Sequence, residues 1–203
     1  MKPLTPASPH AIIMVGIPGS GKSMFAERFA DTFQAPIISQ TKLQQEYDLP
    51  LEQAEKLRAF ILGEYMKTHR TVLIDGGFNN KKKRDELVRA LVKGGYRPLV
   101  VWVQTDTVES KRRALRPYPK GSGLSAESFA MLVDDFNAPT TKEKAVVISG
   151  KHTYTAQLKI ILKQLATPDT TQPKVPLSEQ QKRSAVKVAV RNRTAERRRR
   201  FIS

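Results

Sequence analysis

The stretch Gly16-Ile17-Pro18-Gly19-Ser20-Gly21-Lys22-Ser23 decides the fold, because it fits the pattern G-x-x-x-x-G-K-[ST]. The apolar run 11–15 before it has the length of a buried parallel strand, and residues 24–30 after it favour a helix with Phe25 and Phe29 on one face. Its glycines permit backbone conformations that a Cβ excludes, so the loop N–H groups can converge on an anion at the helix N-terminus. The stretch therefore predicts a phosphate-binding loop rather than a plain glycine turn.

Several residues follow from that loop as candidates for binding ATP and Mg²⁺. Lys22 is expected to reach the β- and γ-phosphates, and Ser23 is expected to ligate the metal. Asp75 ends another apolar run and is the expected second metal residue, the alternative being that it caps the turn at Gly76-Gly77. Motor-type ATPases carry a glutamate at the position of Gly76, so the sequence favours phosphoryl transfer or nucleotide binding over a motor. The predicted nucleotide-binding residues are Ile17, Pro18, Gly19, Ser20, Gly21, Lys22, Ser23 and Met24.

Composition limits the classes that need to be considered. The 203 residues, 39% of them hydrophobic, suffice for one α/β domain with an appendage. The chain has no cysteine, which excludes disulfides and cysteine-ligated zinc. It has neither a signal-peptide-like start nor an apolar run of membrane-spanning length, so a cytoplasmic protein without a membrane partner is expected. The net charge of +16 indicates acidic partners such as nucleotide or nucleic acid.

Strand-like and helix-like segments alternate along residues 11–166, after a proline-rich lead-in over residues 1–10. This alternation predicts an α/β domain with a parallel sheet and helices on both faces, and ligands in such sheets bind at the carboxyl ends of the strands. The loop at Gly16 and the carboxylate of Asp75 would both lie there. The five predicted strands are 11–15, 36–39, 71–75, 98–103 and 145–149.

Two of the predicted helices carry further expectations. The helix over 51–68 has an apolar stripe at three- and four-residue spacing that we expect to be core: Leu51, Ala54, Leu57, Ile61 and Tyr65. The helix over 81–93 opens on Lys81-Lys82-Lys83-Arg84, where cations are unfavourable against the helix dipole, and this run hints at an anion-binding role.

Arginines precede a Pro/Gly-rich loop at 116–123. Arg112 and Arg116 are four residues apart and share a helix face, so both are expected to clamp the transferring phosphoryl group. The alternative is a solvated basic face. Together with Lys22 and Asp75 they make up the predicted catalytic set.

At these residues the chain resembles the P-loop kinases related to polynucleotide 5′-hydroxyl kinase and zeta toxin, which carry an AAA-type ATP-binding domain. The resemblance lies in the loop at 16–23, the segment 72–79 with its following basic residues, and the arginine pair followed by Phe136-Asn137-Ala138-Pro139 and Glu143. It covers about residues 11–166. It implies a P-loop NTPase three-layer fold with strand order 2-3-1-4-5, and ATP as the phosphoryl donor.

The sequence departs from that family on the acceptor side. Where the family has Ser-x-Asp-x-hydrophobic-Arg, with Asp as general base on the acceptor hydroxyl, this chain has Thr41 for Asp and Gln44 for Arg. A missing base typically costs 10²- to 10⁴-fold in rate, although phosphoryl transfer depends mostly on positioning and charge. Glu46 and Asp48 are the candidate substitutes.

Three functional interpretations remain open from the sequence. The first is an ATP/Mg²⁺-dependent phosphotransferase acting on a hydroxyl of a nucleic acid or nucleotide. The second is a non-catalytic ATP-binding module that regulates an RNA, ribosome or protein partner. The third is a small-molecule kinase similar to zeta toxin.

The end of the chain differs in composition from the domain. Residues 167–176 are rich in proline and threonine and predict a linker, and residues 177–203 form a basic tail compatible with a helix. Over 167–203 there are ten cationic and three acidic residues, a net charge of +7. Such runs bind nucleic acid or acidic surfaces, or serve only as a solvated tail. The expected nucleic-acid contacts are Lys182, Arg183, Lys187, Arg191, Arg193, Arg197, Arg198, Arg199 and Arg200.

Binding through this tail should be electrostatic and nearly indifferent to base sequence, because phosphate contacts position without specifying. If about six cations engage duplex phosphates, log K falls against log salt with a slope near −5. A chain ending at Ala166 should lose most of that slope while keeping its response to ATP. Titration of duplex DNA across about 50–200 mM salt tests this; equal affinities for the full and shortened chains would rule the tail out as the contact.

Overall fold

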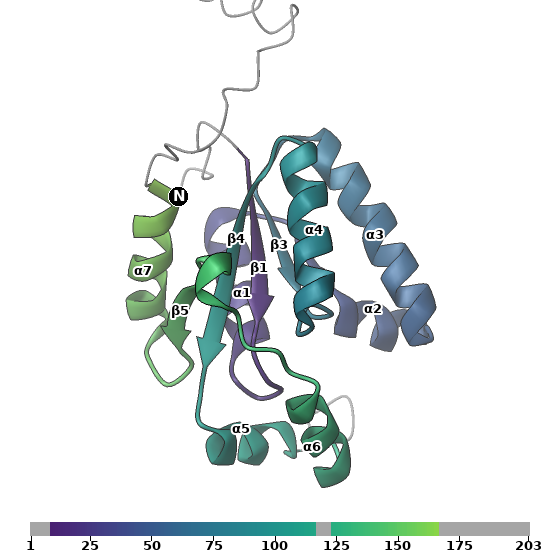
Figure 1. The fold of residues 1–203 in the computed structure, drawn as a ribbon, viewed down its shortest axis with the longest axis vertical. Coiled ribbons are helices and arrows are strands. Elements are labelled where there is room, and N and C mark those ends of the chain that lie inside the picture. The colour runs from purple at the N-terminus through teal and green to yellow at the C-terminus, as the bar shows by residue number, and fades with distance from the viewer. Residues whose placement is uncertain (1–8, 117–122, 167–203) are drawn as a thin grey trace, which may run out of the picture. The chain divides into compact units, whose positions relative to one another are not determined.

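A computed structural model of the chain describes residues 9–116 and 123–166. Five strands form one parallel sheet in the order β2-β3-β1-β4-β5, as the resemblance predicted (Figure 1). The predicted linker and basic tail lie outside the described residues, as does most of the lead-in. Over the described ranges, no helix has the length and apolar character needed to cross a bilayer. The strands are β1 (His10–Val15), β2 (Ile37–Ser39), β3 (Val72–Asp75), β4 (Arg97–Gln104) and β5 (Val146–Ser149).

Helices cover both faces of this sheet, which gives the three layers. Helices α1 and α7 pack on one face and α3 and α4 on the other, while α5 and α6 lie beyond the carboxyl end of β4 (Figure 1). The helices are α1 (Lys22–Phe33), α2 (Gln40–Tyr47), α3 (Leu51–Lys67), α4 (Lys81–Lys93), α5 (Thr107–Ala114), α6 (Ala126–Asp134), the 3₁₀ turn η1 (Thr141–Glu143) and α7 (Tyr154–Ala166).

The central strand β1 shows why the sequence forms this arrangement. All six of its residues are buried, and successive side chains point to opposite faces. Ile12 and Met14 pack in the core under α1 and α7, whereas Ala11, Ile13 and Val15 pack under α3 and α4. A strand covered on both faces reads as a continuous apolar run, which is the pattern that identified it.

The prediction that the apolar stripe of α3 lies in the core is wrong for the two ends of the stripe. Leu51 is 54% and Tyr65 36% exposed, and the buried positions of the helix are Ala54, Arg58 and Leu62. The reason is the position of α3 against β2, a three-residue strand at the edge of the sheet. So short a strand leaves little surface to cover, and the buried strip of α3 is correspondingly narrow.

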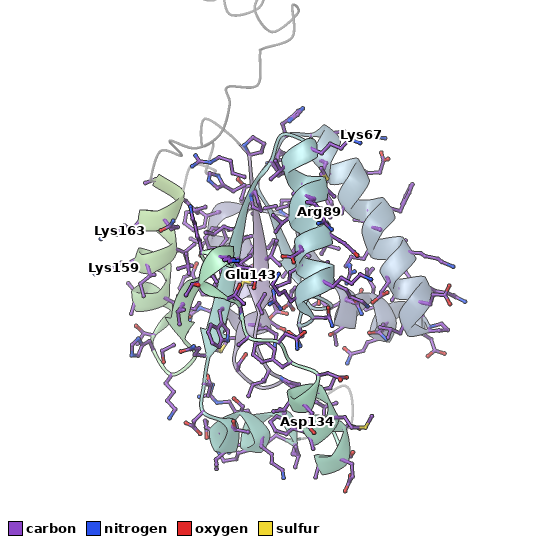
Figure 2. The ribbon with its side chains drawn as sticks, in the orientation of Figure 1. Lys67, Arg89, Asp134, Glu143, Lys159 and Lys163 are labelled. Atoms are coloured by element: carbon purple, nitrogen blue, oxygen red, sulfur yellow. The ribbon has the colours of Figure 1, made fainter. Side chains whose placement is uncertain are left out.

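The cationic run at the start of α4 contacts the protein's own carboxylates. Arg84 is fully buried and forms a two-pronged ion pair with Glu143, Nε to Oε1 at 2.7 Å and Nη2 to Oε2 at 3.2 Å. Glu143, labelled in Figure 2, is the last residue of the turn η1. Arg84 Nη1 donates to the carbonyls of Phe78 and Asn79. We expected this run of cations to bind an anion. For Arg84, that anion is the carboxylate of Glu143 in the same chain. The same pair fixes the segment that returns from α6 to β5.

Replacing Arg84 with Met should lower the free energy of unfolding by about 3–5 kcal/mol, because it leaves a buried carboxylate unpaired. The matched control is Lys83→Met on the same helix, whose pair with Glu55 is partly exposed to solvent; that change should cost less than about 1 kcal/mol. Urea denaturation measures both. A loss of similar size in the two variants would contradict the structural role given to Arg84.

Candidate functional site

The loop between β1 and α1 takes a shape that only glycine permits. Gly16, Gly19 and Gly21 have φ of 147°, 75° and 103°. A Cβ on Gly19 would collide with the carbonyl oxygen of Ser110 in α5, so the loop packs backbone against backbone. Gly21 is the N-cap of α1 and offers no side-chain cap. The first N–H groups of α1 are therefore left for an anion at the positive end of the helix dipole.

Two further segments hold the loop from the side of β4 and β5. Thr105 Oγ1, just after β4, donates to the carbonyl of Ser20 at 2.9 Å. Gly150, just after β5, packs so closely on Ser20 that a Cβ there would collide with its carbonyl oxygen. The backbone N–H of Gly150 donates to Gln104 O at 2.7 Å, which joins the two strand ends. The loop is thus positioned by the carboxyl ends of three strands.

Lys22, Ser23 and Asp75 come together at this edge, as the sequence predicted they would. Ser23 Oγ donates to Asp75 Oδ2 at 2.7 Å, and Lys22 Nζ donates to the carbonyl of Ile17 at 2.8 Å. Burial lowers the pKa of Lys22 to about 8, against the opposing attraction of the Asp75 carboxylate. Burial removes water from the ammonium, and the attraction of Asp75 does not fully compensate for that loss. A polyphosphate beside Lys22 would supply the missing favourable interaction with the positive charge.

Asp75 has the features of a residue that receives a hard cation. It is 3% exposed; its Oδ2 accepts from Ser23 and, at 3.4 Å, from Ser39, while the buried Oδ1 accepts from no described residue. Carboxylate and hydroxyl oxygens suit Mg²⁺, which usually completes its shell with phosphate oxygens and water. Across the described ranges there is no cluster of three or more His, Cys, Asp or Glu that would hold a metal alone. The donors present therefore fit Mg²⁺ bound together with a nucleotide.

The two arginines predicted to clamp the phosphoryl group, Arg112 and Arg116, make no described contact with the phosphate loop. Arg112 is half exposed and pairs with Glu109 of its own helix, Nε to Oε2 at 2.7 Å. Arg116 is exposed beside residues 117–122, which lie outside the description. Arg113 is the arginine that reaches the loop's surroundings, through a 3.1 Å bond to Gly150 O. Bonds from Arg112 and Arg113 lower the pKa of Glu109 to about 2.

A second group of residues lies at the carboxyl ends of β2 and β3, around Arg58. Arg58 of α3 donates to Gln40 Oε1 and to the carbonyl of Gly76, the latter at 3.5 Å, and stacks 4.3 Å above the Phe78 ring. A Cβ on Gly77, whose φ is 82°, would collide with both Arg58 and Gln40. Gly77 therefore makes room for the guanidinium.

Sequence reasoning missed Arg58, because the aliphatic residues beside it suggested a purely apolar helix face. The available signal was the four-residue spacing of Ala54, Arg58 and Leu62, which places one charge in the middle of the buried strip. A charged residue at such a position needs a polar partner, and the partners come from α2 and from the turn after β3.

Thr41, at the expected general-base position, is exposed and lies next to Gly76. A Cβ on Gly76 would be 3.8 Å from Thr41 Oγ1. The proposed substitutes Glu46 and Asp48 are exposed near the end of α2, and no described contact joins either of them to Thr41 or Asp75. Asp75 is accordingly the carboxylate that the described contacts place at this edge.

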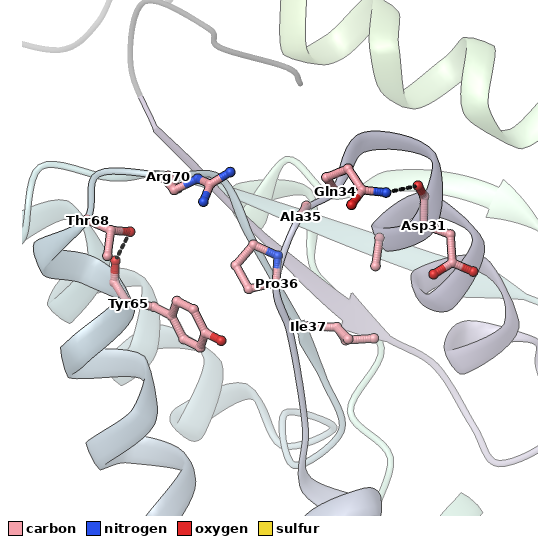
Figure 3. A pocket seen from close by; sticks show the side chains of 9 residues that line it. Asp31, Gln34, Ala35, Pro36, Ile37, Tyr65, Thr68 and Arg70 are labelled. Atoms are coloured by element: carbon pink, nitrogen blue, oxygen red, sulfur yellow. Dashed lines mark hydrogen bonds between the residues drawn. The ribbon is translucent and has the colours of Figure 1, made fainter. Parts of the chain in front are cut away.

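A separate cavity of about 480 Å³ lies at the opposite edge of the sheet, where β2 begins (Figure 3). Its walls come from the end of α1, the start of β2 and the end of α3. None of its lining residues belongs to the phosphate loop or to the group around Arg58, so it is not part of this site. The lining residues are Ala30, Asp31, Gln34, Ala35, Pro36, Ile37, Tyr65, Thr68 and Arg70.

A profile of the AAA domain family matches residues 12–128, more than half of the chain. The match includes the phosphate loop, Asp75 and Arg58. The chain belongs to this family. No curated protein matches this AAA domain protein at a significant level.

Solved structures with the same fold include three kinases. A gluconokinase from Sinorhizobium meliloti 1021 has a TM-score of 0.58 at 19% identity, covering 78% of this chain and 92% of its own. The APS kinase of Mycobacterium tuberculosis, solved with AMPPNP and APS, scores 0.60 at 16% identity and covers 80% and 100%. A sugar kinase from Janibacter sp. HTCC2649 scores 0.56 at 16% identity and covers 79% and 99%. The AAA domain protein thus has a kinase-like P-loop fold.

Adding ATP with Mg²⁺ should stabilise this AAA domain protein by about 2.7 kcal/mol when the nucleotide is at 100 times its Kd. Lys22→Ala should remove most of that gain without unfolding the free protein, because the variant lacks the positive charge that is expected to contact the phosphates. The control is Lys56→Ala on α3, where the lysine is 74% exposed. The measurement is the melting temperature of each protein with and without ATP. If ATP does not change the melting temperature of the parent protein, the loop is not a nucleotide-binding site.

Proposed function

We propose that this protein is an ATP- and Mg²⁺-dependent phosphotransferase whose acceptor is a hydroxyl of a nucleic acid or nucleotide. The observation that carries the proposal is the contact of Ser23 with Asp75 directly after the glycine loop, with Lys22 partly buried beside them. These are the groups that phosphoryl transfer needs for charge and positioning. A cytoplasmic location and tail contacts to nucleic acid belong to the same proposal.

Each residue has a distinct part in that chemistry. The loop N–H groups and Lys22 hold the β- and γ-phosphates, and Ser23 with Asp75 hold Mg²⁺, which supplies charge neutralisation on the phosphate oxygens when bound. Arg112 and Arg116 act as clamps only after moving from the positions described, whereas Arg113 already borders the loop. Ser39, Gln40 and Thr41 mark the acceptor side, because they follow the neighbouring strand β2 and Ser39 contacts Asp75.

A second candidate function is a non-catalytic ATP-binding module that regulates an RNA, ribosome or protein partner. The observation that favours it is Thr41, which leaves the acceptor side without the carboxylate expected as general base. A third candidate keeps the kinase chemistry and gives it a small-molecule acceptor. The three differ in a measurable way, since only the kinases transfer the γ-phosphoryl group of ATP.

The test is single-turnover transfer from γ-labelled ATP to 5′-hydroxyl DNA, 5′-hydroxyl RNA, nucleosides and sugars, with Lys22→Ala as the blank. If the protein is a slow kinase, Thr41→Asp should raise acceptor-dependent transfer by roughly 10- to 100-fold, because a carboxylate would again take the hydroxyl proton. Transfer at the level of the blank for both proteins, with every acceptor, would instead establish the binding module.

A further inference from the structure

Among residues 9–116 and 123–166, two arginines are buried, and their surroundings differ in charge. Arg84 is fully buried and is neutralised by the two-pronged pair with Glu143. Arg58 is 8% exposed, and its described partners are the neutral oxygens of Gln40 and Gly76 and the face of the Phe78 ring. A buried charge is costly unless an opposite charge compensates it, so Arg58 is the exception that requires an explanation.

The carboxylates near Arg58 are already engaged. Glu55, on the same helix, is the acid that acts on it electrostatically, and its carboxylate pairs with Lys83 at 2.6 Å. Burial is the main influence on the pKa of Arg58 and lowers it from its ordinary value, with Glu55 opposing. Only Nη1 has described acceptors, so Nε and Nη2 keep donors that no described residue fills.

The position of Arg58 is the second part of the argument. It lies at the carboxyl ends of β2 and β3, the edge at which ligands bind in such sheets. Its contact Gly76 directly follows Asp75 and has Thr41 on its other side. The guanidinium thus contacts the residue that follows Asp75, at the end of the strand β3 that pairs with the phosphate-loop strand β1.

We propose that Arg58 binds an oxyanion carried by the phosphoryl acceptor, so that the acceptor is an anionic molecule with a hydroxyl near its phosphate, sulfate or carboxylate group. The inference rests on the proposed function and narrows its substrate class. A planar guanidinium with free Nε and Nη2 presents two parallel donors, the geometry that suits such a group. Gln40 and the Gly76 carbonyl hold the guanidinium in place from the Nη1 side.

The binding test uses inorganic sulfate as the probe, with the phosphate loop already filled by AMPPNP and Mg²⁺. The parent protein should show a saturable further rise in melting temperature with sulfate. Arg58→Gln should weaken that sulfate binding by roughly 10- to 100-fold, the loss expected for hydrogen bonds to a charged group. Arg58→Lys keeps the charge but not the paired donors and should fall between the two. Arg89→Gln, an exposed arginine on α4 with the same charge change, is the control and should match the parent.

The outcomes separate this proposal from the one on which it rests. A purely structural Arg58 would lower the melting temperature of the free protein yet leave the sulfate increment intact, and that result overturns the proposal. Should Arg58→Gln not fold, Arg58→Lys carries the same decision. A parent that responds to AMPPNP but not to sulfate also overturns it while leaving the proposed function standing. No response to AMPPNP overturns both.

Acceptor pairs then identify the source of the oxyanion. Adenosine and adenosine 3′-monophosphate differ by a phosphate, and glucose and gluconate differ by a carboxylate. The anionic member should have the lower KM, and Arg58→Gln should raise that KM toward the value of its neutral counterpart with less change in kcat. Equal KM values within every pair that is phosphorylated would overturn the proposal.

Discussion

The backbone of residues 16–21 lies against two other backbone segments, and the rest of the site depends on that contact. Gly19 packs on the carbonyl of Ser110, and Gly150 packs on the carbonyl of Ser20. Neither approach leaves room for a side chain, so the loop is shaped by its neighbours before any nucleotide arrives. Binding then costs little conformational entropy, which is the advantage of a preorganised site. The same contacts link α5, β4 and β5 to the phosphates that the loop would hold.

Asp75 connects this loop with the acceptor side. Through its Oδ2 it accepts from Ser23 of α1 and from Ser39 of β2, so one carboxylate spans the residues of three adjacent elements. Parallel strands make this possible, because their carboxyl ends meet at one edge. Lys22 lies within the field of the same carboxylate and has a lowered pKa because it is desolvated. Asp75 therefore lies between two positions that carry a cation, Lys22 of the loop and, through the carbonyl of Gly76, Arg58.

The sequence was sufficient for features that depend on local patterns. The alternation of elements predicted helices on both faces of a parallel sheet, the family resemblance implied the strand order 2-3-1-4-5, and the structure confirms both. Features that depend on long-range pairing could not be predicted. Arg84 and Glu143 are 59 positions apart, and nothing local links them. Leu51 and Tyr65 are exposed because β2 is short, which is a property of the sheet and not of α3. The role of Arg58 could not be predicted either, because its partners are distant in the sequence and come from α2 and the turn after β3.

Thr41 departs from the pattern of the related kinases, and it lies close to Gly76, the residue whose carbonyl Arg58 contacts. The family pattern puts a carboxylate at position 41 and an arginine at position 44, a pair of opposite charges on α2, and this chain has Thr41 and Gln44 instead. A carboxylate at 41 would lie beside Gly76, the residue to which Arg58 donates, and would attract the guanidinium. With threonine there, position 41 has no carboxylate that could act as a general base or oppose the charge of Arg58. Under the proposed function, an anion bound at Arg58 would recover part of the free energy that burying this cation costs, so the substitution would exchange proton transfer for affinity toward a charged acceptor.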